Sequence, residues 1–319
     1  AGMKNQGGDK GHLEITKINQ RFDDLNHAMK SMLMDESEFK AEQKAEQKNR
    51  KKAEKAKKKG KSTDAEPKKP RVFVTDFDGD IKASATEELR EVVTAILSVA
   101  EENDEVVLRL ESAGGMVHSY GLAASQLRRI TARNIALTVC VDKVAASGGY
   151  MMACVAQKII SAPFAIIGSI GVVAQLPNFH RLLKKHDIDY EMLTAGEYKR
   201  TLTMFGENTD KGRQKFVEDL EDTHVLFKDF IAENREVVDV DSVATGEIWF
   251  GSRALDQKLV DHIDTSDQYL FDLSTHSDIF EVKYTHKKTL AERVGLHVEH
   301  AVERSILGVV QKLNLRYFS

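Results

Sequence analysis

The 319-residue sequence has little cysteine, little proline and no long hydrophobic run. Its two cysteines, Cys140 and Cys154, both lie in apolar segments, which is typical of small buried thiols and excludes a disulfide framework or a cysteine-based zinc site. Four prolines and 41% hydrophobic residues indicate a globular chain with a substantial core, not a disordered protein. No stretch approaches the roughly 18 apolar residues of a membrane span, and no signal peptide opens the chain.

Positive charge is concentrated in one segment. Residues 44–61 carry ten lysines and arginines against Glu46 and Glu54, a net charge of +8 within a chain whose net charge is -4. Because the run has few apolar residues to bury, it predicts a solvated linker or helix. The functional alternative is a contact with anionic lipid headgroups. Nucleic acid is not expected as a partner, since no aromatic side chains are interleaved with the charges.

Composition divides the chain into four parts. These are a polar amino terminus with an amphipathic helix (1–43), a Lys-rich linker (44–69), a folded domain (70–275) and an amphipathic helical extension (276–319). Apolar residues from Ile15 to Met32 recur at helical spacing, so this stripe either packs on its own domain or pairs with a partner helix. The stretch Leu290 to Leu315 is also amphipathic and needs an apolar surface.

Helix-period and strand-like segments alternate within the folded part. Strands are expected at 71–77, 106–110, 135–141, near Ile159 and at 170–173, and helices at 87–100, 120–130, directly after Ser147, and at 211–233. A short helix is expected within 248–261. This alternation predicts an α/β domain with a largely parallel sheet.

Two glycine-rich segments follow predicted strands, where an α/β sheet presents its active groups. In Glu111-Ser112-Ala113-Gly114-Gly115, successive backbone N–H groups can form a nest for an oxyanion, although a plain turn explains the pattern equally well. In 144–150, Ser147 stands between small residues and two glycines, so its hydroxyl can be exposed at a helix N-terminus. A simple serine N-cap is the ordinary alternative.

Two further segments are weaker alone. Residues 168–173 form a short apolar run opened by glycine, which could pair with an extended peptide or be an ordinary edge or core strand. Lys199 follows Tyr198 in a polar stretch where a lysine is normally just solvated. A lysine serves as a general base only where its surroundings favour the neutral form.

Taken together, these four segments resemble the S49 family of bacterial serine peptidases. The resemblance extends over residues 71–264 and includes DKVAASGGYMMACVA, SAPFAIIGSIGVVAQ, AGEYKRTLT, GENTDKGR and ATGEIWFG. It implies a fold similar to those of Clp protease and crotonase, and a Ser/Lys dyad. It also implies that an amino-terminal membrane helix precedes this chain.

The resemblance assigns a role to each motif. Ser147 would be the nucleophile, Lys199 its general base, and Ser169 the residue that orients the lysine. The oxyanion hole would use backbone N–H groups of Gly114, Gly115 and Gly148. Two positions depart from the family pattern: Ala113 replaces a proline, which removes a φ restraint, and Lys258 replaces a glycine at an expected helix C-cap.

An extended peptide substrate is expected to lie along two backbone segments. The residues expected to bind it are Met116, Val117, Gly171, Val172, Val173 and Met151, with Met151 equally explained by core packing. In this mechanism neutral Lys199 removes the Ser147 proton and returns it to the leaving amine. No metal or organic cofactor is required.

Two rival functions use the same sequence features. A crotonase-like acyl-CoA enzyme would use the glycine nest for a thioester enolate without a dyad, and a non-catalytic scaffold would keep only the fold and its helical ends. The resemblance favours a homo-oligomeric peptidase at the bacterial inner membrane. The basic run would place its body on the cytoplasmic face by the positive-inside rule.

Overall fold

The computed structural model describes residues 11–45, 48 and 69–286. The chain forms two compact units, one of Ala1–Glu14 with Lys283–Ser319 and one of Ile15–Val282. The fold below is that of the second unit, because the first contributes only residues 11–14 and 283–286 to the described part. The predicted amphipathic stretch at 290–315 and most of the Lys-rich run lie outside the described residues.

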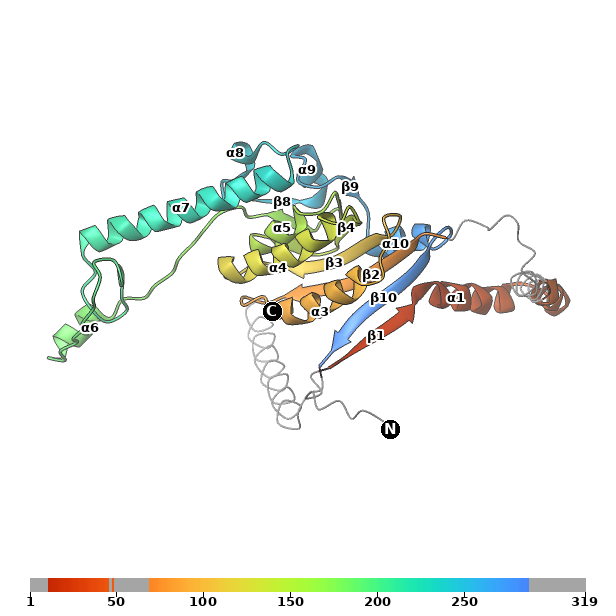
Figure 1. Ribbon diagram of the computed structural model, residues 1–319, viewed down its shortest axis with the longest axis horizontal. Helices are drawn as coiled ribbons and strands as arrows, with labels where there is room; N and C mark the ends of the chain where they lie inside the picture. Colours follow the sequence, from red (N-terminus) through yellow and green to blue (C-terminus); the bar gives the residue numbers. More distant parts are fainter. Residues whose placement is uncertain (1–10, 46–47, 49–68, 287–319) are drawn as a thin grey trace, which may run out of the picture. The chain divides into compact units, whose positions relative to one another are not determined.

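Ten strands form one sheet within the described part of the chain (Figure 1). They are β1 (His12–Lys17), β2 (Arg71–Gly79), β3 (Glu105–Ser112), β4 (Ala136–Val141), β5 (Val144–Ala146), β6 (Lys158–Ser161), β7 (Ile166–Gly168), β8 (Ile248–Phe250), β9 (His262–Ile263) and β10 (Asp278–Thr285). The helices are α1 (Ile18–Leu33), α3 (Thr86–Leu97), α4 (Val117–Thr131), α5 (Gly148–Ala153), α6 (His180–Lys185), α7 (Asp210–Asn234), α8 (Val240–Val243), α9 (Gly251–Asp256) and α10 (Ser266–Leu273).

The sheet is almost entirely parallel. Its main path runs β10-β2-β3-β4-β6-β9 with every neighbouring pair parallel, and β1 follows β10 at the edge. A branch runs from β3 through β5 to β7, again in parallel, and β8 closes it as an antiparallel strand. The predicted α/β class with a largely parallel sheet is therefore confirmed.

Apolar side chains alternate along β2 and fill both faces of the sheet. Val72 and Val74 join a buried cluster with Leu270 of α10. Phe77 points to the other face, where its ring meets that of Tyr120 in α4 with centroids 6.4 Å apart. Helices on both faces therefore bury the parallel strands, as this kind of sheet requires.

The carboxy-terminal part of the described chain contains a strand. Residues 278–285, which the sequence assigns to a helical extension, form β10, and Asp278–Glu281 pair in register with Arg71–Val74. The side chains of Ile279 and Val282 in this strand are buried. The main sheet therefore includes a strand that lies after the predicted domain boundary at residue 275.

The amino-terminal helix α1 agrees with packing on its own domain over its first turns, and a partner helix stays a prediction. Its first turns pack on the domain: Phe22 makes an edge contact with Phe271 of α10 at 5.4 Å, and Asn19 donates to the carbonyls of Ser274 and Ser277. Later residues stay open, with Met32 87% exposed. The first half of the stripe therefore packs on its own domain, and the second half remains available to a partner.

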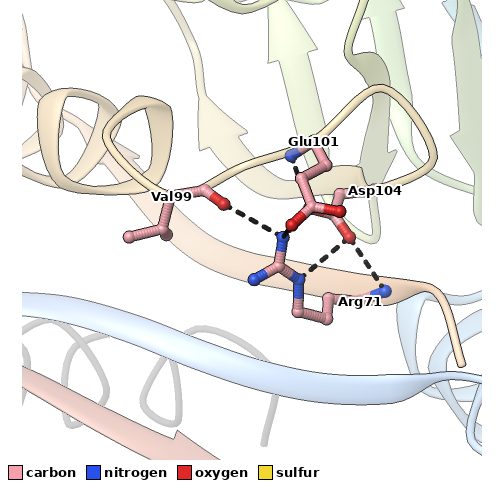
Figure 2. Close-up of polar contacts among 4 residues, drawn as sticks. All are labelled: Arg71, Val99, Glu101 and Asp104. Atoms are coloured by element: carbon pink, nitrogen blue, oxygen red, sulfur yellow. Dashed lines mark hydrogen bonds and ion pairs between the residues drawn. The ribbon is translucent and has the colours of Figure 1, made fainter. Parts of the chain in front are cut away.

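Arg71 fixes the start of the domain (Figure 2). Its guanidinium forms two hydrogen bonds to the Asp104 carboxylate, at 3.1 and 2.5 Å, and donates to the Val99 carbonyl at 3.0 Å. Burial raises the pKa of Asp104, but hydrogen bonds from Arg71 and from the Glu101 N–H outweigh burial and leave this pKa below its usual value. The contact joins the first residue of β2 to the turn before β3.

The chain between β7 and α7 projects from the sheet (Figure 1). It runs out to α6 and returns along the 25-residue helix α7, whose carboxy-terminal part packs near α8 and α5. We call residues 172–215 the arm. Nearly all side chains from 173 to 200 are exposed. In the described ranges, no helix is both long enough and apolar enough to cross a bilayer.

Candidate active site

Ser147 occupies a strained turn between β5 and α5. Its backbone has φ 52° and ψ -118°, a conformation that residues with a side chain rarely adopt. The turn is held because the Ser147 N–H donates to the Gly168 carbonyl at 2.7 Å and the Ser147 carbonyl accepts from Met151 N–H at 3.0 Å. A half-buried serine at a strand-to-helix turn of this kind has the geometry of an exposed nucleophile.

Gly114 lies directly against this turn. A Cβ at Gly114 would be 2.8 Å from Ser147 Cβ and 2.7 Å from Gly148 N, and Gly114 has φ +89°. Only glycine fits such a place. Gly148 is in the first turn of α5, where helix N–H groups have no intrahelical partner. The structure therefore brings together Ser147, Gly114 and Gly148, three of the residues that the sequence singles out.

A buried hydroxyl network supports the Gly114 turn. Ser112 Oγ accepts from the Gly114 N–H at 3.1 Å and lies 2.6 Å from the Tyr120 hydroxyl, which donates to the Asp80 carbonyl at 2.7 Å. Burial raises the pKa of Tyr120, so its hydroxyl keeps its proton and remains a donor. The Gly114 N–H is thus already engaged, whereas the Gly115 N–H has no hydrogen-bond partner among the described residues.

The two glycines after Ser147 have separate packing reasons. A Cβ at Gly148 would enter the ring of Tyr120, and one at Gly149 would lie 2.5 Å from the Ser112 carbonyl. The buried Tyr150 hydroxyl donates to the Leu259 carbonyl at 2.9 Å, which ties α5 to the chain after α9. The sequence pattern points to this glycine pair. It does not predict the hydrogen bond between Ser112 and Tyr120, because no local signal links two residues eight positions apart.

Ser169 lies beside Ser147 through strand pairing. Ala146 of β5 is in register with Gly168 of β7, so the two serines follow paired positions. Ser169 has φ 52°, and its N–H donates to the Glu247 carbonyl at 2.6 Å. Its placement near the nucleophile is compatible with the orienting role, which stays a prediction.

The strand predicted at 170–173 is not formed. β7 ends at Gly168 because the positive φ of Gly168 and Ser169, +99° and 52°, turns the chain out of the extended path. The Ile170 carbonyl accepts from Gly246 N–H at 3.0 Å instead. Apolar content alone could not distinguish a strand from this irregular segment.

The predicted substrate-binding residues are divided between surface and core. Met116 and Val117 follow the glycine nest and are 42% and 41% exposed. Val173 is 80% exposed, whereas Gly171 and Val172 are half-buried. Met151 is buried at 5% exposure, which agrees with the core-packing alternative for this residue.

No hydrogen bond joins Lys199 to Ser147 in the described part of the chain. Lys199 lies in the arm, exposed, between α6 and α7, and its ammonium makes no hydrogen bond or ion pair with any described residue. Its backbone N–H donates to the Gly196 carbonyl at 3.2 Å. The proposed nucleophile and the proposed base therefore belong to different segments, the turn between β5 and α5 and the arm.

No metal centre is evident in the described part of the chain. No group of three or more histidine, cysteine or acidic side chains there has a geometry suited to a metal ion. The carboxylate of Asp80, the residue after β2, accepts hydrogen bonds from the N–H groups of Lys82 and Ser84 and from the Ser84 hydroxyl. These hydrogen bonds, led by those from Ser84, lower the pKa of Asp80.

Comparisons with known proteins identify the family of the chain. The family model "Peptidase family S49" matches residues 129–279, and "Peptidase family S49 N-terminal" matches residues 1–127. The chain is similar to "Probable protease SohB" of Haemophilus influenzae, with 55% identity over 295 residues, 91% of this chain and 83% of that protein. A "Probable protease SohB" of Buchnera aphidicola subsp. Schlechtendalia chinensis is 60% identical over 201 residues, 63% of this chain and 66% of that protein.

Among solved structures, the chain is similar to a membrane-bound stomatin-specific protease mutant in complex with a substrate peptide. The TM-score is 0.44 with 11% identity, and the match covers 72% of this chain and 98% of that one.

The class of protein is therefore a peptidase with an α/β fold. Within that class, the chain belongs to peptidase family S49, as the identity and coverage of its relatives show.

Proposed function

We propose that the protein is a serine endopeptidase in which Ser147 attacks the peptide bond and Lys199 acts as general base. The observation that carries the proposal is the strained Ser147 turn, with Gly114 packed against its Cβ and the Gly148 N–H beside it. A strained, over-determined backbone at a serine is characteristic of a site built for chemistry. Family membership supports the same reaction class.

The reaction proceeds in two halves. Neutral Lys199 takes the Ser147 proton as the hydroxyl attacks, and the proton then passes to the leaving amine, which leaves an acyl-enzyme. Water repeats the sequence and releases the acyl group. The tetrahedral oxyanion is held by the N–H groups of Gly148 and Gly115, with each donor worth about 10²–10³ in kcat. The Gly114 N–H would join them only after leaving Ser112 Oγ.

Lys199 is supplied by a second copy of the chain in this proposal. The arm, which includes Lys199, projects from the sheet (Figure 1) and has many exposed large apolar side chains, which a monomer rarely leaves open. These are Val173, Leu176, Phe179, Leu182, Ile188, Tyr190, Met192, Leu193, Tyr198, Met204 and Phe205. Assembly would cover this surface and complete the dyad, in agreement with the homo-oligomer expected from the sequence.

The substrate proposed is an extended stretch of unfolded or membrane-associated polypeptide. Exposed Met116 and Val117 beside the glycine nest offer an apolar surface next to the reacting bond. We expect a preference for a small apolar residue before the cleaved bond. A peptide library that showed a charged residue there would overturn this assignment.

The test combines covalent labelling with turnover. A fluorophosphonate probe should label Ser147 in the intact protein, and Ser147→Ala should abolish both labelling and peptide hydrolysis while keeping the circular dichroism spectrum. Lys199→Ala and Lys199→Arg should both lose turnover, because a guanidinium does not give up its proton. Hydrolysis retained in Ser147→Ala would overturn the proposal, and so would acyl-CoA turnover without labelling.

Membrane association at the cytoplasmic face is a further part of the proposal. It rests on the charge of residues 44–61, where each basic residue near an anionic surface contributes about 1 kcal/mol. The chain should bind vesicles containing phosphatidylserine, and added salt should release it. Equal binding to neutral vesicles, or none to either, would contradict an electrostatic contact.

A further inference from the structure

We infer that Lys211, in the first turn of α7, is a positioning residue that holds the Lys199 loop and keeps the Glu197 carboxylate away from the Lys199 ammonium. The inference rests on the proposed role of Lys199 as general base. Lys211 itself touches neither substrate nor nucleophile.

The contact between Lys211 and Glu197 is direct. Lys211 Nζ lies 2.5 Å from Glu197 Oε1, and Lys211 also lies over the Tyr198 ring at 5.9 Å from its centroid. Lys215, one turn later, lies over the same ring at 5.8 Å. The two residues immediately before Lys199 are therefore attached to α7 by two lysines of one helix face.

The residues after Lys199 are fixed to the same turn of α7. A Cβ at Gly212 would collide with the Thr201 carbonyl, so the chain two residues after Lys199 packs on bare backbone. The Gly212 N–H in turn donates to Thr209 Oγ at 3.1 Å, which caps α7. Lys199 thus lies in a short loop, and the residues before it and after it both contact the start of α7.

The next residues are also held. Asn178 Nδ2 donates to the carbonyls of Thr203 and Gly206 at 2.9 and 3.0 Å, and the Thr203 N–H donates to Asn208 Oδ1 at 2.8 Å. Phe205 stacks on Phe179 with centroids 6.0 Å apart. Although the arm is exposed, it is internally ordered, and the Lys211 contact is part of that order.

The stability of the fold does not account for the pair. Lys211 and Glu197 are 70% and 60% exposed, and solvent screens exposed pairs of this kind so that they contribute little to stability. Their consequence is local, because Glu197 is two residues from Lys199. A carboxylate released there would attract the Lys199 ammonium and favour its protonated form, which cannot act as a base.

The charged groups around Glu197 are few. Lys211 lowers the pKa of Glu197 by hydrogen bonding and by charge, with a smaller hydrogen bond from Tyr198, and the pKa of Lys211 is raised in return. Lys215, which lies beside Tyr198, forms an ion pair with Asp219 at 2.8 Å, and its Nζ also lies 3.9 Å from the Glu218 carboxylate. Lys199 and Arg200 are the remaining cations of the loop.

The experiment measures kcat, KM and the pH dependence of kcat in the full chain. Lys211→Ala should lower kcat about fivefold at neutral pH with little change in KM, and should move the rising limb of the profile upward by about 0.5 pH unit. The double variant Lys211→Ala with Glu197→Gln restores the neutral charge of the pair. It should return the profile to the wild-type position while kcat stays low. Lys211→Arg should be close to wild type.

Lys228→Ala is the matched control. Lys228 lies on the same helix, and its ion pair with Asp241 has the same 2.5 Å separation but lies far along α7 from Lys199. Equal kcat and equal pH profiles for Lys211→Ala and Lys228→Ala would overturn the inference. Failure of the underlying function would look different, because Lys199→Ala would then keep full turnover in the wild-type background.

Discussion

The nucleophile turn and the arm are built in opposite ways. Ser147 is surrounded by backbone that leaves no room for a single extra methyl group at Gly114, Gly148 or Gly149. Lys199 is exposed, and a Cβ at Gly196, three residues earlier, would meet nothing closer than Lys199 Cβ at 4.0 Å. In the function that we propose, one chain would complete the nucleophile and oxyanion half of the site, and a second copy would supply the base.

The largest difference between the two regions should appear in their ion pairs. Arg235, at the end of α7, has a 4% exposed side chain, donates to the Lys258 carbonyl and forms two hydrogen bonds with Asp261. Arg235→Ala removes these hydrogen bonds and leaves the Lys258 carbonyl without its donor, while Asp261, 36% exposed, still accepts from the Ile159 N–H, so it should cost about 1.5–3 kcal/mol of unfolding free energy. Lys215→Ala in the arm should leave the urea midpoint nearly unchanged, because solvent screens its ion pair with Asp219. Urea denaturation of both variants measures this contrast, and equal losses would remove it.

Glycine substitutions provide the second contrast. Gly148→Ala places a methyl group against the Tyr120 ring. It should lower the free energy of unfolding by about 1–3 kcal/mol and should abolish the labelling of Ser147. Gly121→Ala in α4 is the control, since nothing lies within 4 Å of its added Cβ. That variant should gain about 0.5–1 kcal/mol from helix propensity. Normal labelling in a folded Gly148→Ala protein would show that the turn tolerates expansion.

Acid should weaken the contact between Arg71 and Asp104 at the start of the domain (Figure 2). The folded pKa of Asp104 is lowered, so its contribution is present above the unfolded value of about 3.9 and is lost as pH falls through the lower folded value. Asp104→Ala should therefore cost about 1–3 kcal/mol at pH 7, and the gap from wild type should narrow below pH 4. Glu101→Ala, which removes a 70% exposed partner of Arg71, is the control. A gap constant down to pH 2 would contradict the assignment.

The smallest predicted effect is a gain. Lys258 ends α9 with φ 58°, and the Leu259 N–H donates to the Ala254 carbonyl at 2.9 Å, the geometry of a glycine cap. Lys258→Gly should raise unfolding free energy by about 0.5–1 kcal/mol without changing turnover. A calorimetric decrease in Tm would show that the lysine side chain stabilises the cap in a way its exposure does not suggest.

The sequence predicts the buried parts of this protein well because their signals are local. Apolar runs gave β2, β3 and β4, and helical periodicity gave α3, α4 and α7, with bounds close to those observed. The meeting of Gly114 with Ser147 follows from two glycine-rich segments at neighbouring strand ends. The C-cap expected at Lys258 came from the resemblance to the family, which has a glycine there, and the residue has φ 58°.

Other features depend on contacts that no local pattern reports. β10 was missed because its buried residues, Ile279 and Val282, lie three apart, which is a helical spacing, whereas residues on one face of a strand are two apart. The Ser112–Tyr120 hydrogen bond joins two polar residues that would read as exposed. The projection of the arm, and with it the separation of Lys199 from Ser147, has no sequence signature at all.

Co-assembly of two inactive variants tests the central claim most directly. If Ser147 and Lys199 come from different copies, Ser147→Ala and Lys199→Ala proteins refolded together in equal amounts should recover about a quarter of wild-type peptide hydrolysis, because random mixing places an intact serine beside an intact lysine at that frequency. Each variant refolded alone should stay inactive. A mixture that assembles but shows no hydrolysis would contradict a dyad shared between copies.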